Sequence, residues 1–401
     1  MTSDGSRSRE EKSSGHYSLG VFVGLSLVFL LFLKPTVGHT LEFLGLPCLF
    51  SPDTYYALLA GVAFACVGWR LWRRGIDVFS GLMMVAVAWI AVATLKNGGE
   101  TVRLFTDWLP LLATVCLVGS LHRDYKRELL SAMFFACVFY LILNLMGIFQ
   151  SGDIGFKSQV YLFFEVKTAT FRIAIPAIIC SLLLDHLDGK KLSVPTVTVY
   201  GLCLFEMTTG FAATSLATLL LLGVFVAIGQ CAPVRKVLNA VTFFGADLLA
   251  FLAVVVLRVQ NHLGWLIQGV LGKTMTLSGR IPIWDVVFQL LSNGHFFWGY
   301  GASYIWNAIV VGGSPYMHAH NDILNIFMTG GLVLAVIALA MFLLVACRLY
   351  RTRSLMPGFI LSCGLGCFLL EGLFEITSCV GFFFILAMAY YWFSGAQGRR
   401  A

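Results

Sequence analysis

Charged residues are scarce in this chain. Asp, Glu, Lys and Arg make up 12% of the residues, whereas a soluble domain carries about 25%. Hydrophobic residues reach 59%, and they gather in runs long enough to cross a bilayer. The composition therefore excludes a soluble protein and predicts an all-α integral membrane protein. The net charge of +7 does not indicate nucleic-acid binding, because the basic residues are scattered through short connections.

Metal-ligand motifs are missing as well. The eleven cysteines include no CxxC pair and no Cys/His spacing typical of a metal site. Most of them lie inside apolar runs, where a thiol behaves as a small apolar side chain. The predicted outer connections contain no Asp-x-Asp pair and no cluster of carboxylates. The sequence thus predicts neither a metal site nor a cofactor.

Apolar runs predict about twelve transmembrane helices. Their approximate ranges are 17–33, 54–72, 77–95, 105–121, 127–149, 169–186, 193–209, 212–230, 237–257, 331–349, 357–374 and 376–394. The first range ends without a small-residue cleavage site, which favours a retained span over a removed signal peptide. With the N-terminus in the cytoplasm, every cytoplasmic segment carries at least two Lys or Arg residues, as the positive-inside rule requires.

This topology divides the chain into five parts. They are a disordered cytoplasmic N-terminus at 1–16, nine helices within 17–257, a large outer loop at 258–330, three helices within 331–394, and a cytoplasmic tail at 395–401. Loops as long as 258–330 are usually functional or disordered, and the aromatic content of this one argues against disorder. We expect short interfacial helices within it at Leu263–Leu271 and Ile283–Leu291.

A polar island, Ser314–Asp322, closes the outer loop. Ionisable side chains at a membrane boundary are costly, so they indicate function. His320 is the candidate general base, because imidazole can take a proton from a hydroxyl at neutral pH. His318 and Asn321 are candidate substrate contacts, although helix capping is an alternative for Asn321 and the neighbouring Asp322. Asp322 could also orient a histidine.

Nine Lys and Arg residues fall on the predicted outer side, against the topology rule, and three of them are candidate ligands for an anion. These three are Lys167, Arg172 and Arg280. The forked donors of arginine match phosphate oxygens, so these cations suit a diphosphate. Plainer roles remain open, namely a snorkelling Arg172, an interface anchor at Lys167 and a loop charge at Arg280. Glu371 and Glu375 are four residues apart on one helix face, where they could contact sugar hydroxyls, balance Arg172, or serve gating or packing.

Four motifs appear in a fixed order along residues 160–375. They are Lys167-Thr168 with Arg172, Ser278-Gly279-Arg280 with Trp284, Gly299-Tyr300-Gly301, and His320-Asn321 followed after nine residues by Gly331. Together they resemble the O-antigen ligase and polysaccharide polymerase superfamily of bacterial membrane glycosyltransferases. The sequence departs from that pattern at Thr168, where Asn is usual, and at Leu334, where Gly, Thr or Tyr is common.

The resemblance implies about twelve helices with one large outer loop, in the bacterial inner membrane. It implies a glycan donor carried on undecaprenyl diphosphate, and metal-independent attack of an acceptor hydroxyl on the sugar C1. Within that scheme His320 would activate the acceptor, and Arg172 and Arg280 would bind the diphosphate. A chain-length regulator or a flippase would be the expected protein partner.

Three functions are compatible with the sequence. The leading prediction is a polymerase that joins lipid-linked repeat units into an O-antigen, capsule or exopolysaccharide. The first alternative is a ligase that transfers a finished glycan to a lipid or protein acceptor. The second is a secondary transporter of an anionic solute, although such proteins usually bind their substrate near the bilayer midplane and often consist of repeated halves.

Overall fold

The computed structural model describes residues 17–33, 52–151, 167–210, 212–262, 279–302, 309–316 and 318–393. Its helices are α1 (Leu19–Phe32), α3 (Pro52–Arg74), α4 (Val78–Lys96), η1 (Leu104–Trp108), α5 (Leu109–Leu121), α6 (Lys126–Ser151), η2 (Lys167–Thr170), α7 (Phe171–Leu187), α8 (Val194–Thr209), α9 (Ala213–Ile228), α10 (Ala232–Val237), α11 (Ala240–Ala250), η3 (Phe251–Val256), η4 (Val259–His262), α12 (Arg280–Leu290), η6 (Leu291–His295), α14 (Asp322–Arg351), α15 (Met356–Gly372) and α16 (Val380–Tyr391). Two short strands, β1 (Ile309–Val311) and β2 (Ser314–Tyr316), form an antiparallel hairpin.

The described helices confirm an all-α membrane protein. Each of the twelve predicted ranges contains a helix. Five helices are long and apolar enough to cross a membrane, namely Asp53–Arg74, Val78–Lys96, Leu104–Leu121, Lys126–Phe149 and Asp322–Arg351. Several of the others are shorter apolar helices of 10–17 residues, so the number of twelve spans stays a prediction.

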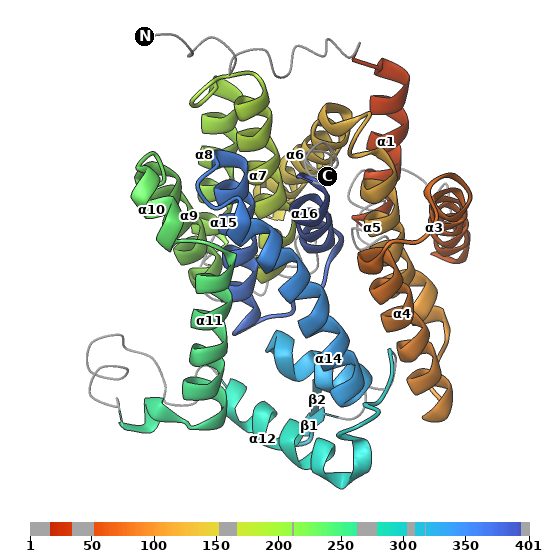
Figure 1. Cartoon of the computed structure of the whole chain (residues 1–401). Helices are drawn as coiled ribbons and strands as arrows, with labels where there is room; N and C mark the ends of the chain where they lie inside the picture. Colours follow the sequence, from red (N-terminus) through yellow and green to blue (C-terminus); the bar gives the residue numbers. More distant parts are fainter. Residues whose placement is uncertain are drawn as a thin grey trace.

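One large core holds the bundle together, and α5 is buried in it. Every residue of α5 is buried, as expected of a helix that is apolar on all sides. α5 packs against α3, α4 and α16, while α6 packs against α1 and α7. Figure 1 shows α12 and the hairpin at one end of this bundle.

A second, smaller core lies beneath the predicted site. It is built around the fully buried Trp284 of α12, together with residues of the hairpin and the first turns of α14. The Trp284 indole N–H donates to the carbonyl of Ala319, at 3.1 Å. This core anchors the residues just before α14 to α12, so the two halves of the outer loop are held together. The predicted helix at Ile283–Leu291 is confirmed by α12, whereas Leu263–Leu271 lies outside the described residues.

The helix α14 begins nine residues earlier than the predicted span at 331–349, and it bends at Gly331. Gly331 has φ 63° and ψ −158°, a conformation that is open almost only to glycine. A Cβ atom there would overlap the carbonyl of Phe297. The chain around Gly299 crosses the bend closely, with the Tyr300 N–H donating to Met328 O at 2.6 Å. The bend therefore couples the Gly-Tyr-Gly motif to the helix that follows His320.

Candidate active site

His320 lies at the entrance to α14. Its φ of 48° is left-handed, one of two such non-glycine residues among the described ones, and this conformation is uncommon for a residue with a side chain. The next residue, Asn321, is the N-cap of α14, and its side-chain oxygen accepts the N–H of Leu324 at 2.9 Å. The Asn321 amide also donates to the carbonyl of Leu373 at 3.2 Å. The predicted capping role of Asn321 is confirmed.

Glu375 joins His320 to Arg280. The Nη2 of Arg280 donates to Oε1 of Glu375 at 2.8 Å, and its Nε donates to the carbonyl of Phe374 at 2.9 Å. Nδ1 of His320 lies 3.3 Å from the other carboxylate oxygen of Glu375. The structure thus brings together a residue of α12, a residue before α14 and a residue after α15 in one charged group.

The charges of this group set the protonation of Glu375. Burial alone would raise the pKa of Glu375, but contact with His320 and the charge of Arg280 hold that pKa below its ordinary value. Glu375 is therefore ionised at neutral pH. A carboxylate beside Nδ1 of His320 favours the tautomer that carries its proton there. That tautomer leaves the Nε2 lone pair available to take a proton.

His318 lies beside His320, with the two rings tilted by 54°, and it stays neutral. Their ring centroids are 3.9 Å apart, and Nδ1 of His318 accepts the backbone N–H of His320 at 3.2 Å. Burial, then the charge of His320, lowers the pKa of His318 to about 3, with smaller contributions from Arg172 and Arg280. His318 is placed to hold the backbone of His320, and a role in contacting substrate stays a prediction.

Asp322 connects the start of α14 to the segment that carries Glu375. Its carboxylate accepts the N–H and the hydroxyl of Thr377, at 3.2 and 2.7 Å, and the hydroxyl of Ser378 at 3.4 Å. Together with the Asn321–Leu373 bond, these contacts hold residues 373–378 beside the entrance to α14. Asp322 therefore positions Glu375 against His320.

Replacing Asp322 tests this positioning role. We expect Asp322→Ala to lower activity about tenfold to a hundredfold, because the buried Thr377 loses its acceptor and the segment 373–378 shifts. Asp322→Asn keeps an acceptor oxygen and should retain more activity. The steady-state rate and the KM for donor are measured for both variants. Equal activity of wild type and Asp322→Ala would contradict the positioning role.

The other predicted residues lie in different places. Arg172, in the first turn of α7, donates from Nη2 to the carbonyl of Ile376 at 3.4 Å, so it reaches the same segment as Arg280. Its Nε is buried without a hydrogen-bond partner among the described residues. Lys167 belongs to η2, but its side chain lies outside the described part.

The two glutamates do not share one helix face as predicted. α15 ends at Gly372, so Glu375 lies in the turn that follows it. Glu371 is fully buried in the last turn of α15, where it lies beside Ser215 and Thr218 of α9. Glu375 balances Arg280, which was not predicted. The signal that could have indicated this is the polar segment after α15, Glu375-Ile376-Thr377-Ser378, between two apolar runs.

A metal could be considered at this group. Ligand atoms of His318, His320 and Glu375 lie within 4.8 Å of one another. However, Glu375 already forms an ion pair with the guanidinium of Arg280. The permanent charge of Arg280 would repel a second cation at this place. Nδ1 of His318 is also engaged by a backbone N–H. The arrangement suits proton transfer and anion binding better than it suits a divalent ion.

Comparisons with known proteins point to one family. No curated protein and no solved structure matches the chain. Residues 197–339 match the family model described as O-antigen ligase, a range that contains Arg280, His318, His320 and Asn321. This match supports a domain of the O-antigen ligase and polymerase type at residues 197–339.

Proposed function

We propose that this protein polymerises lipid-linked oligosaccharide units into a surface polysaccharide, using His320 as general base and Arg280 and Arg172 to bind the diphosphate of the donor. The observation that carries the proposal is the group formed by His320, Glu375 and Arg280. His320 and Arg280 lie in the range that matches the O-antigen ligase family model. Glycosyl transfer from a diphosphate needs a base that takes the proton of the acceptor hydroxyl. It also needs cationic donors that bind the phosphate oxygens.

The proposed reaction is a single displacement at the sugar C1. Nε2 of His320 takes the proton of the acceptor hydroxyl, while the oxygen of that hydroxyl forms a bond to C1. The bond between C1 and the phosphate oxygen breaks, and the lipid diphosphate leaves with the electron pair. Arg280 and Arg172 stabilise the negative charge that grows on that oxygen, which is the interaction that lowers the barrier. Glu375 stabilises the imidazolium that forms on His320.

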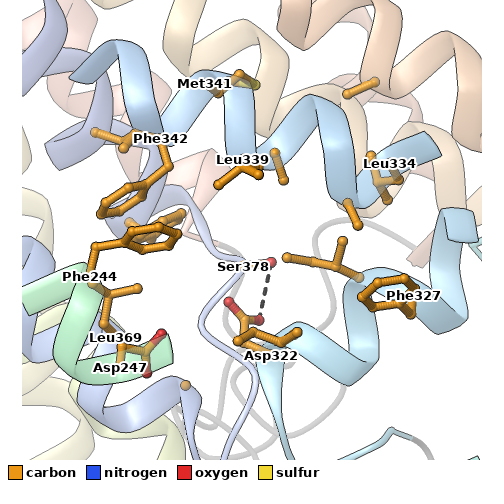
Figure 2. Close-up of a pocket in the computed structure, with 18 of the residues that line it drawn as sticks. Phe244, Asp247, Asp322, Phe327, Leu334, Leu339, Met341, Phe342, Leu369 and Ser378 are labelled. Atoms are coloured by element: carbon orange, nitrogen blue, oxygen red, sulfur yellow. Dashed lines mark hydrogen bonds between the residues drawn. The ribbon is translucent and has the colours of Figure 1, made fainter. Parts of the chain in front are cut away.

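An apolar cavity beside the site supports a lipid-linked donor. Its volume is about 360 Å³, and it lies between α11, α14, α15 and α16. Figure 2 shows Phe244, Leu339 and Phe342 around its open centre, with Asp322 and Ser378 at one edge. Leu248 and Leu339 line the cavity and are more than one-third exposed, so it opens toward the membrane. An isoprenoid chain in this cavity would start next to the charged group.

We further propose that the charged group faces the outside of the bacterial inner membrane, with both termini in the cytoplasm. The C-terminal turn of α14 supports this orientation, because it carries Arg348 and Arg351. Basic residues favour the cytoplasmic end of a span, and His320 lies at the opposite end of the same helix.

Purified protein in bilayer discs tests the function. The protein is incubated with a labelled lipid-linked repeat unit, with and without a lipid acceptor and in the presence of a chelator. We expect a ladder of lengthened glycans that the chelator does not suppress. A single transfer to the added acceptor would instead indicate a ligase. Movement of an anionic solute across vesicles without bond formation would contradict the enzyme.

A further inference from the structure

A second cavity lies at the opposite end of α14 from His320. Its volume is about 570 Å³, and its walls come from the α3–α4 turn, the α5–α6 turn and the C-terminal ends of α14 and α16. Five arginines line it, namely Arg70, Arg73, Arg74, Arg123 and Arg348. The charge pattern of the sequence assigns this end to the cytoplasm. The proposed glycosyl transfer at the other end makes no use of it.

The carboxylates near this cavity neutralise only part of its charge. Asp77 pairs with Arg70, and Asp124 pairs with Arg74 at 2.6 Å. Arg73, Arg123 and Arg348 have no carboxylate within ion-pair distance among the described residues. Three guanidinium charges around one cavity therefore remain without a counter-charge from the described part of the protein.

Hydrogen bonds hold the side chains in the wall of this cavity in place. Arg70 is 4% exposed, and its Nη1 donates to the carbonyl of Gly119 at 2.9 Å. The Nε of Arg70 is buried and has no hydrogen-bond partner among the described residues, although such donors are usually satisfied. The hydroxyl of Tyr391 donates to Asp77 at 2.6 Å, which fixes the partner of Arg70.

Arg348 is fixed in a similar way. Its Nη1 donates to the carbonyl of Tyr390 at 2.7 Å, and its Cζ lies 3.7 Å from the centre of the Tyr390 ring. An aromatic ring below a guanidinium leaves the outer edge of the fork available to a ligand. Trp72, next to Arg73 in the chain, is 82% exposed, as interfacial tryptophans commonly are.

We propose that this cavity binds a phosphate group. Forked guanidinium donors match phosphate oxygens, and basic pockets between helix ends on the cytoplasmic side suit anionic headgroups. The cavity is larger than a free phosphate needs, so a phosphoester fits it. The phosphate can come from an anionic phospholipid of the inner leaflet or from a soluble phosphoester, and the two sources share the same recognition chemistry.

Two binding measurements separate these sources. Native mass spectrometry of the protein released from discs that contain cardiolipin and phosphatidylcholine reports retained lipid. Calorimetric titration of protein in pure phosphatidylcholine discs with pyrophosphate reports soluble anion binding. Retained cardiolipin with weak pyrophosphate binding assigns a lipid, and the reverse assigns a soluble phosphoester. Binding of neither probe would overturn the proposal.

The double variant Arg73→Gln/Arg123→Gln localises the binding. It removes two unneutralised charges without touching Arg70 or Arg348, and we expect probe affinity to fall about tenfold or more. The control Lys190→Gln/Lys191→Gln removes two exposed charges outside the cavity on the same predicted side, and it should bind like wild type. Unchanged melting temperatures show that both variants fold. Equal affinities of the two double variants would contradict the assignment to this cavity.

Discussion

Removing the imidazole of His320 should lower glycosyl transfer by about 10²–10⁴-fold, the usual contribution of a positioned general base. The most specific variant is His320→Asn, because asparagine tolerates the left-handed backbone that His320 adopts with φ 48°. His320→Ala should lose at least as much activity, with added backbone strain. The protein should still fold, because the His320 side chain is partly exposed.

A matched control for His320 is available at the C-terminal end of α7. His186→Ala removes an exposed histidine in the last turn of that helix, and it should leave the rate unchanged. Turnover of the labelled donor is compared at equal protein concentration after size-exclusion chromatography. If His320→Asn polymerised at the wild-type rate, the assignment of the base would be wrong.

Arg280→Lys should reduce the rate by about 10²–10³-fold, although the charge is kept. Arg280 donates at the same time from Nη2 to Glu375 and from Nε to the carbonyl of Phe374. A lysine has one ammonium group and cannot hold both acceptors and a phosphate oxygen. We expect a raised KM for the donor together with a lowered kcat, because Glu375 also loses its orientation toward His320.

Arg258→Lys is the matched control for Arg280→Lys. Arg258 makes an ion pair to the exposed Asp285 of α12, from Nη2 at 2.7 Å, and a single ammonium can replace that contact. This variant should keep most of the activity. Comparable losses in the two variants would indicate a general effect on α12 rather than a specific role of Arg280.

Much of the helical frame was predictable from apolar runs, because lipid requires each span to satisfy its own backbone. The start of α14 was not predictable in this way. Residues 322–330 are helical although the predicted span begins only at 331. The helix starts earlier because Asn321 caps it, and it bends at Gly331. The bend depends on a backbone crossing with Phe297, which is distant in sequence.

The members of the charged group were predictable, but their partnership was not. His320 and Arg280 belong to polar motifs that stand out in an apolar chain. The pairing of Arg280 with Glu375 joins residues that are 95 positions apart, and it depends on how α12 packs against the end of α15. Asp322 was expected to cap a helix or orient a histidine, whereas its carboxylate accepts from Thr377 and Ser378 across the loop. Such contacts follow from tertiary packing, which local patterns do not contain.

One measurement tests the central claim most directly, namely that the protein makes a glycosidic bond at the expense of a lipid diphosphate. A donor labelled separately in its glycan and in its lipid is supplied to purified protein in bilayer discs. The mechanism predicts one free lipid diphosphate for each new glycosidic bond, and neither product from His320→Asn. A labelled glycan that stays attached to its lipid in the wild-type reaction would contradict the account.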